Sequence, residues 1–435
     1  MLLAHSISFD PADPRAGLSG LPQAPGVFAL FGADPAAEPY LSKTPNLRRR
    51  LMRFLREAPP VHQESGASGG LPPQLQTRRL RLAHMVSRIE YTVAGGEFES
   101  SLCLYQASLQ VFGDRARRRL RLRPPAFLRM SVENAYPRVY VTTRLAKSAA
   151  PSLFGPFPSR AAAERYAEEM LNLFLLRRCT DDLHPDPAFP GCPYSEMKMC
   201  LAPCFRGCSD ERYRQEADEV RDFLSTRGAG LLRRLEAERN AASESLQFER
   251  AQQLHQRIQK VQVVAQLASE AVRPLAQLSG ILIQPAADPE CVALFGLRAG
   301  LLRGPAFYPT MGMRLPNERS GSSSLFPQPV ALEAVPLEPE PEPRQRAAKD
   351  ILEARLDEAL LALDSKPSRS SSQAIFSDHL ALFARWFYRP AAQRIGEVVF
   401  SGGDGELPRK PLLRAIARVA ARAAGVAAGV AAGPA

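Results

Sequence analysis

Long apolar runs are missing from this chain of 435 residues. No uninterrupted hydrophobic segment approaches the roughly 20 residues that a membrane-spanning helix needs. The first residues, MLLAHSISFDPADPR, have neither the basic start nor the long apolar centre of a secretory signal. These absences argue against membrane and secreted classes of protein. We therefore expect a cytoplasmic protein without a membrane partner.

Acidic side chains are in the minority, because 45 Asp and Glu residues oppose 56 Lys and Arg residues and leave a net charge of +11. This excess favours a polyanionic partner, above all DNA. The arginines gather in two segments, 48–56 and 115–123, and each guanidinium can bond two phosphate oxygens at once. A solvated Arg-rich surface from a GC-rich coding sequence is the alternative. The predicted DNA-binding residues are Arg48, Arg49, Arg53, Arg117, Arg118 and Arg119.

Cysteines are also few, yet four of the seven fall within a short Pro-rich stretch with the spacing Cys-x12-Cys-x7-Cys-x3-Cys. In a cytosolic protein, close thiols indicate a metal site rather than disulfides. Structural zinc sites usually present tight Cys pairs, whereas this shortening spacing suits an iron-sulfur cluster at least as well. Zinc, unrelated buried thiols, and Cys208 as a replacement ligand remain open. The predicted ligands are Cys179, Cys192, Cys200 and Cys204.

Short apolar runs alternate with amphipathic helical segments, which predicts an α+β chain of several domains. The predicted units are a small α/β domain at 20–112, a Cys-rich mixed region at 113–228, a helical hairpin at 229–272, a mixed α/β region at 273–400 with a disordered loop at about 316–347, and a basic helix with a low-complexity tail at 401–435.

The predicted hairpin carries a narrow apolar stripe at helical spacing. Such a stripe needs a partner, which is either the neighbouring helix or another chain. A charged helix of this kind can also be an ordinary solvated helix. The predicted contact ridge consists of Phe248, Ala251, Leu254 and Ile258.

Four segments in this order, covering about residues 20–310, resemble the UvrC family, the nuclease subunit of bacterial nucleotide excision repair. They are LPQAPGVFALFG with EPYLSKTPNLRRRLMRF, YPRVYVTTR with LFGPFPSRAAAERY, CPYSEMKMCLAPC with Cys179 upstream, and EAERNAASESLQFERAQQLHQRIQKV. The third implies a [4Fe-4S] cluster on the cysteine quartet. The fourth is similar to the UVR motif, which implies UvrB as a partner beside DNA. The resemblance also implies a place in the SOS response.

The first segment is similar to the opening of a GIY-YIG nuclease domain. The resemblance assigns Tyr40 to the second tyrosine, Lys43 to the lysine that follows it, and Arg50 to the catalytic arginine. It also implies Mg2+ or Mn2+ as the catalytic ion. Phe28 stands where the family has its first tyrosine, so the ring is kept and the hydroxyl is lost. Ser42 replaces the glycine of the second strand.

The family's metal-binding glutamate has no clear counterpart. The best alignments place it at Leu104, Tyr105 or Gln106, and no acid occurs from position 100 to position 113. Glu97 and Glu99 lie one to two turns earlier and can serve only if the helix is shifted. Since Mg2+ needs hard anionic oxygen ligands, a site without this carboxylate should bind the ion poorly.

Two functions follow from these residues. The first is a UvrC-like endonuclease that makes one incision near damage after recruitment by UvrB. The second is a catalytically eroded relative that binds DNA and UvrB as a repair scaffold or regulator. No segment matches the RNase H-like domain or the helix-hairpin-helix module of the family, and the region after Met311 has no assigned role.

Overall fold

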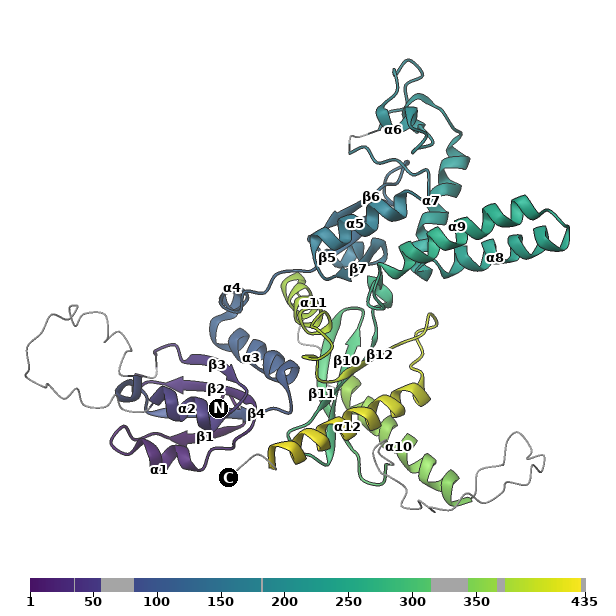
Figure 1. The fold of residues 1–435 in the computed structure, drawn as a ribbon. Helices are drawn as coiled ribbons and strands as arrows, with labels where there is room; N and C mark the ends of the chain where they lie inside the picture. The colour runs from purple at the N-terminus through teal and green to yellow at the C-terminus, as the bar shows by residue number, and fades with distance from the viewer. Residues whose placement is uncertain (35, 56–81, 181–182, 314–342, 366–371, 432–435) are drawn as a thin grey trace, which may run out of the picture.

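Three small antiparallel sheets with surrounding helices make up the chain in the computed structural model (Figure 1). The α+β prediction is confirmed. The predicted disordered loop lies outside the described residues, apart from its last positions, which begin a helix. The structure describes residues 1–34, 36–55, 82–180, 183–313, 343–365 and 372–431.

The N-terminal sheet has the strand order β1-β4-β2-β3 and begins upstream of the predicted boundary at residue 20. Helices α1 (Pro14–Ser19) and α2 (Leu47–Leu55) cover one face. The Asn46 side chain accepts a hydrogen bond from the Arg49 amide at 2.8 Å and caps α2. A Cβ at Gly26 would lie 2.4 Å from the Thr92 carbonyl oxygen, so this strand position requires glycine. The strands are β1 (His5–Ser8), β2 (Gly26–Phe31), β3 (Tyr40–Thr44) and β4 (Arg88–Val93).

The middle part is built on a second sheet with the order β6-β5-β7-β8. Helix α5 (Arg160–Leu171) and helix α7 (Asp210–Thr226) share one core with this sheet, and each begins at a serine cap. The cysteine-rich segment, with α6 (Pro193–Glu196), forms a lobe at the top of Figure 1. The strands are β5 (Ala126–Met130), β6 (Val139–Thr142), β7 (Leu153–Phe157) and β8 (Arg273–Pro274).

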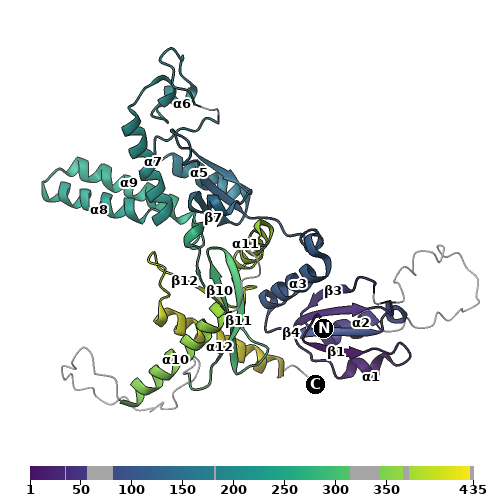
Figure 2. The same cartoon turned by 180° about the vertical axis from the view of Figure 1, so that it is seen from behind.

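The predicted helical hairpin consists of α8 (Ala229–Glu244) and α9 (Phe248–Gln266) and projects sideways from the middle part in both views (Figures 1 and 2). Its base is fixed because Val261 and Val264 join the middle core together with Phe223 of α7. The far end, residues 243–250, is exposed at every position. The hairpin is therefore rooted at one end and free at the other.

The C-terminal sheet has the order β11-β10-β9-β12. Helices α10 (Pro343–Ser365) and α12 (Arg409–Ala431) cover one face, and α11 (Gln373–Phe387) packs on the other. The apolar side of α12 is buried against the sheet, so this helix belongs to the same unit as the strands and does not form the separate segment predicted from sequence. The strands are β9 (Gly280–Pro285), β10 (Cys291–Arg298), β11 (Leu301–Pro309) and β12 (Glu397–Phe400).

Helix α3 (Glu97–Phe112) lies between the N-terminal and C-terminal sheets (Figures 1 and 2). One side contributes Ala107 to a cluster with Val27 and Ala29 of β2. The opposite side contributes Phe98 to the C-terminal core, where its ring lies 5.1 Å from that of Phe295. The junction between the two sheets is thus a packed interface.

Short helical turns complete the described chain. No helix in the described ranges combines the length and apolar character required to cross a membrane. The turns are α4 (Ala116–Arg119) and the 3-10 turns Leu82–Met85, Gly113–Arg115, Lys147–Ser152, Pro203–Phe205 and Leu275–Gln277.

Candidate active site and nucleic-acid interface

Tyr40 begins the edge strand β3 and is 46% exposed. Its ring stacks on Phe54 of α2, with 5.6 Å between ring centroids, and the Arg50 guanidinium lies 4.9 Å from the same Phe54 centroid. Phe54 therefore joins two of the three predicted catalytic residues, a role that sequence reasoning missed. Phe28 is fully buried beside them, so this position offers packing and no hydroxyl.

Lys43 lies on the opposite face of the same strand, because side chains alternate between faces along a strand and positions 40 and 43 are three apart. Its Nζ is 2.9 Å from Glu97 Oε1 and donates a hydrogen bond to Ser101 Oγ at 2.7 Å. Both partners belong to α3. The predicted catalytic trio is therefore divided, with Tyr40 and Arg50 on the α2 face and Lys43 on the α3 face.

Glu97 is the first residue of α3 and carries an ion pair that sequence reasoning missed. Both of its carboxylate oxygens are bonded by the guanidinium of Arg389, which follows α11 in the C-terminal unit. The hydrogen bond from Arg389, assisted by Lys43, lowers the pKa of Glu97 to about 2 against the opposing effect of burial. The carboxylate is thus ionised at neutral pH and bound by two cations from two different units.

The three positions expected for a metal-binding glutamate have other roles in the structure. Leu104 packs with the apolar cluster around Val27 and Ala29. Tyr105 is buried and donates a hydrogen bond to Asp378 at 3.3 Å, while Gln106 is exposed. The α3 surface that faces the sheet is therefore apolar where the resemblance calls for a carboxylate.

Glu99, the other acid that precedes the expected glutamate position, forms a hydrogen bond at the start of its own helix. Its Oε2 accepts a hydrogen bond from the Gly95 amide at 2.7 Å. Burial raises the pKa of Glu99, and the Gly95 bond opposes that change. A carboxyl that is hard to ionise is a poor ligand for a divalent cation. Glu97, in contrast, forms an ion pair with Lys43, one of the predicted catalytic residues.

The predicted DNA-binding arginines of α2 differ in their availability. Arg49 and Arg53 are exposed, and no carboxylate of the described chain pairs with either side chain. Arg48 is half-buried, and its Nε donates a hydrogen bond to the Leu21 carbonyl at 2.5 Å. Two of these three predicted DNA-binding arginines are thus available to a phosphate, while Arg48 supports the fold.

The three arginines of α4 divide in a similar way. Arg117 Nε lies 3.2 Å from Asp378 Oδ1, so this side chain supports a buried acid of the C-terminal unit. Arg119 pairs with Glu38 at 2.7 Å and lies 3.9 Å from the Phe112 ring centroid. Arg118 has no acidic partner among the described residues. It is the α4 arginine with the freest guanidinium.

The four predicted cysteine ligands are all partly buried in the lobe at the top of Figure 1. Burial raises the pKa of Cys200 to about 11, and the thiols of Cys179, Cys192 and Cys204 add to that effect electrostatically. Across the described ranges, however, no group of three or more His, Cys, Asp or Glu side chains is arranged as a metal site.

Nitrogen donors approach two of the four thiols. The Ala202 amide donates to Cys200 Sγ at 3.3 Å, and the buried Arg177 donates to Cys179 Sγ at 3.5 Å. Lys198, Ala202 and Arg206 of the same segment adopt left-handed conformations. Donors of this kind stabilise thiolates in metal-sulfur centres. The donor set therefore fits a thiolate-bound group.

The predicted contact ridge of the hairpin does not share one exposed face. Phe248 is 67% exposed, and the neighbouring Leu246 is 72% exposed. Ile258 is only 3% exposed and packs in the middle core, with Leu254 half-buried beside it. Ala251 is also half-buried. Because the lower end of the ridge is used for packing within the chain, only its Phe248 end is open to a partner.

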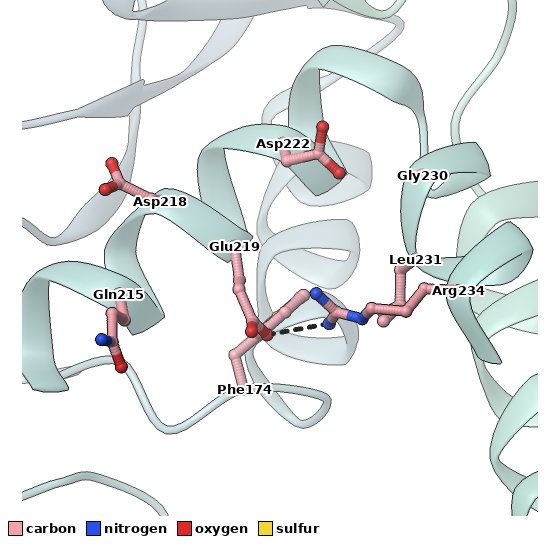
Figure 3. A pocket seen from close by; sticks show the side chains of 8 residues that line it. All are labelled: Phe174, Gln215, Asp218, Glu219, Asp222, Gly230, Leu231 and Arg234. Carbon is pink, nitrogen blue, oxygen red and sulfur yellow. Dashed lines mark hydrogen bonds and ion pairs between the residues drawn. The ribbon is translucent and has the colours of Figure 1, made fainter. Parts of the chain in front are cut away.

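A shallow pocket lies where α7 meets α8 (Figure 3). Asp218, Glu219 and Asp222 line it, and Glu219 Oε2 is 3.1 Å from the guanidinium of Arg234. Three carboxylates around one paired cation repel a phosphate. This pocket is therefore unsuited to the DNA backbone.

Two family models match the chain. Residues 126–223 match the UvrC/Cho excinuclease, middle domain, and residues 229–263 match the UvrB/uvrC motif. The first covers β5, β6 and β7 of the second sheet with α5 and most of α7, and the second covers most of the hairpin. Tyr40, Lys43 and Arg50 lie outside both models.

Curated proteins named UvrABC system protein C are similar over a longer stretch. The protein of Ectopseudomonas mendocina is 28% identical over 319 residues, which cover 71% of this chain and 47% of the relative. The protein of Hyphomonas neptunium is 30% identical over 294 residues, which cover 66% of this chain and 44% of the relative. The protein of Proteus mirabilis is 29% identical over 269 residues, which cover 58% of this chain and 39% of the relative. The chain spans about half the length of the curated relatives it matches. No solved structure matches it.

Proposed function

Since this chain is a relative of the UvrC proteins through its middle domain and its UvrB/uvrC motif, we propose that it is a cytoplasmic DNA-binding protein of nucleotide excision repair whose GIY-YIG-like domain does not cut DNA. It binds DNA through its arginine surfaces and UvrB through its hairpin. Its role is to hold repair components together on the damaged duplex.

The division of the predicted catalytic residues carries the non-cleaving part of the proposal. Phosphodiester hydrolysis needs a base, a charge-stabilising cation and a metal-bound oxygen around one reacting phosphorus. Here Tyr40 and Arg50 lie on one face of β3, whereas Lys43 lies on the other and is bonded to Glu97. Leu104 packs where the metal-binding carboxylate is expected. These residues do not surround a common point.

Free cations support the DNA-binding part of the proposal. Arg49, Arg53 and Arg118 have no acidic partner within the described chain, and the protein carries a net charge of +11. Each guanidinium that neutralises a backbone phosphate releases a counterion, so affinity falls steeply with salt. We expect binding that depends on duplex charge more than on base sequence.

The exposed hairpin end supports the UvrB contact. Its sequence matches a motif named after both UvrB and UvrC, and Phe248 with Leu246 offers a small apolar anchor at the tip. Exposed aromatic anchors of this kind carry much of the binding energy in protein interfaces. UvrB is accordingly the proposed partner of this end of the hairpin.

A [4Fe-4S] cluster is the proposed cofactor of the cysteine lobe, with zinc as the alternative. Cys179, Cys192, Cys200 and Cys204 would supply thiolate ligands, and the Ala202 amide and the Arg177 guanidinium already donate to two of them. Such a group would tie together a lobe that has few buried apolar side chains of its own. Its role there is structural.

A nicking assay tests the proposal directly. A damaged duplex is incubated with the protein, UvrB, and Mg2+ or Mn2+, with a UvrABC system protein C as the positive control. We expect no incision by the parent or by Arg50→Ala, together with DNA binding that weakens as salt rises. Incision by the parent that Arg50→Ala abolishes would overturn the non-cleaving assignment.

Incision remains the second candidate because one observation favours it. The Glu97 carboxylate is ionised, lies 2.9 Å from Lys43 and is 48% exposed, so a rotation of its side chain offers it to a divalent cation. In that case Glu97→Gln abolishes metal-dependent nicking. Glu164→Gln on α5, an exposed acid that pairs with Arg160 of its own helix, is the matched control.

A further inference from the structure

Two cations from different parts of the fold bind one carboxylate at the junction of the N-terminal and C-terminal sheets. Lys43 of β3 approaches Glu97 Oε1 at 2.9 Å, and Arg389, which follows α11, bonds both Glu97 oxygens. The Ser101 hydroxyl accepts a hydrogen bond from Lys43 at 2.7 Å. Two cations thus bind one small anion that the chain itself supplies, and Ser101 helps to position one of them.

This arrangement has the chemistry of a phosphate-binding site. An arginine fork bonds two oxygens of a carboxylate or of a phosphate with similar geometry, and an ammonium group adds a point charge. A backbone phosphodiester carries a single negative charge, as the Glu97 carboxylate does. Replacing one by the other therefore leaves the charge balance of the site unchanged.

The backbone segments that carry the site are held by contacts that do not involve the Glu97 carboxylate. Phe98, the residue after Glu97, is anchored in the C-terminal core. The Arg389 amide donates to the Trp386 carbonyl at 3.2 Å, which fixes the end of α11. The Glu97 side chain itself is 48% exposed. The carboxylate can therefore swing into water by side-chain rotation, with Lys43 still bonded to Ser101 and the Arg389 backbone still bonded to Trp386.

From this geometry we infer that Lys43 and Arg389 form a phosphate-binding site shared between the two units, and that Glu97 is an internal occupant that a DNA backbone phosphate displaces. The inference rests on the proposed function only in taking DNA as the source of the phosphate. Arg389 becomes a DNA-contacting residue that neither family model includes. Glu97 acts as a competitor that weakens DNA binding.

Salt-dependent DNA binding of Glu97 variants tests this inference. Glu97→Gln removes the competing charge, so one more phosphate is bound and the slope of log affinity against log salt steepens by about 0.9. At low salt we expect affinity to rise roughly threefold to tenfold, on the same counterion argument. Adding Arg389→Gln to Glu97→Gln should return both values to those of the parent. Glu164→Gln controls for the change in net charge alone.

A second readout uses inorganic phosphate and does not depend on DNA. Millimolar phosphate should raise the melting temperature of Glu97→Gln more than that of Glu164→Gln or of Glu97→Gln/Arg389→Gln, because ligand binding stabilises the folded state. If phosphate protects Glu97→Gln selectively while no variant binds DNA, the site stands and the proposed function fails. If Glu97→Gln behaves as Glu164→Gln in both assays, the inference is wrong.

Discussion

Arg117 and Arg118 are adjacent residues of α4, yet they contact different surroundings. Arg117 pairs with Asp378, which is 4% exposed and also receives a hydrogen bond from Tyr105. Arg118 has no acidic partner in the part of the chain that the structure describes. The same residue type therefore serves the fold at one position and remains available to a ligand at the next.

Alanine substitution should separate these two roles. Arg117→Ala leaves the buried Asp378 without its cation, and we expect the free energy of unfolding to fall by about 2 kcal/mol. This loss is smaller than the roughly 3–5 kcal/mol expected for a fully buried pair, because the Arg117 side chain is partly exposed. Arg118→Ala should leave stability within about 0.5 kcal/mol and reduce the salt slope of DNA binding by about 1. Denaturant unfolding and DNA titration measure both. Equal effects of the two substitutions in either assay would contradict this division.

At the scale of elements, the sequence predicted helices and strands better than it predicted contacts between residues far apart in the chain. The hairpin, the α2 start at Asn46 and the apolar strands follow from periodicity and capping, which involve neighbouring residues. The placement of Tyr40 and Lys43 on opposite faces of β3 also follows from the sequence, because side chains alternate between the two faces along a strand. The Glu97–Arg389 pair joins residues 292 apart in the chain. No sequence pattern within either segment predicts this ion pair.

Helix α3 shows why the candidate site was only partly predictable. Its sequence lacks acids from position 100 onward, which correctly left Glu97 and Glu99 as the available carboxylates. What the sequence did not reveal is that both sides of the helix are covered, one by the N-terminal sheet and one by the C-terminal core. Since packing on two sides fixes the helix, Glu97 faces Lys43 and Arg389 at the same time.

The cysteine lobe carries a prediction at this same scale. If the quartet holds a [4Fe-4S] cluster, anaerobically purified protein is brown and absorbs near about 400 nm, as thiolate-bound clusters do. Cys200→Ser should bleach it and lower stability, since thiolate ligation supports folding of such segments. Cys208→Ser is the control, because Cys208 packs beside the middle core and does not contribute to the electrostatics of Cys200. A colourless preparation with one zinc per chain would replace the cluster by zinc.

For the whole molecule, the arrangement of the parts links the proposed partners. The hairpin is anchored in the middle core by Val261 and Val264 and extends away from the N-terminal sheet in both views (Figures 1 and 2). Helix α2, which carries the exposed arginines, packs on that N-terminal sheet. A partner on the hairpin end and a duplex on the N-terminal unit therefore occupy separate surfaces, as a scaffold requires.

Substitution at the hairpin tip tests this separation. Phe248→Asp places a charge at the centre of the proposed UvrB contact, and we expect a loss of at least about 2 kcal/mol, or roughly 30-fold in affinity, as for an interface anchor. The free energy of unfolding should not change, because Phe248 is 67% exposed.

Val263→Asp is the matched control, since Val263 is 62% exposed on the same helix but lies away from the tip. Calorimetric titration against UvrB, with DNA binding measured in parallel, should show the partner affinity falling for Phe248→Asp alone and the DNA affinity unchanged for both. Equal loss of UvrB affinity for the two variants would mean that the partner covers the helix side rather than the tip, and a joint loss of DNA affinity would mean that the two surfaces are not separate.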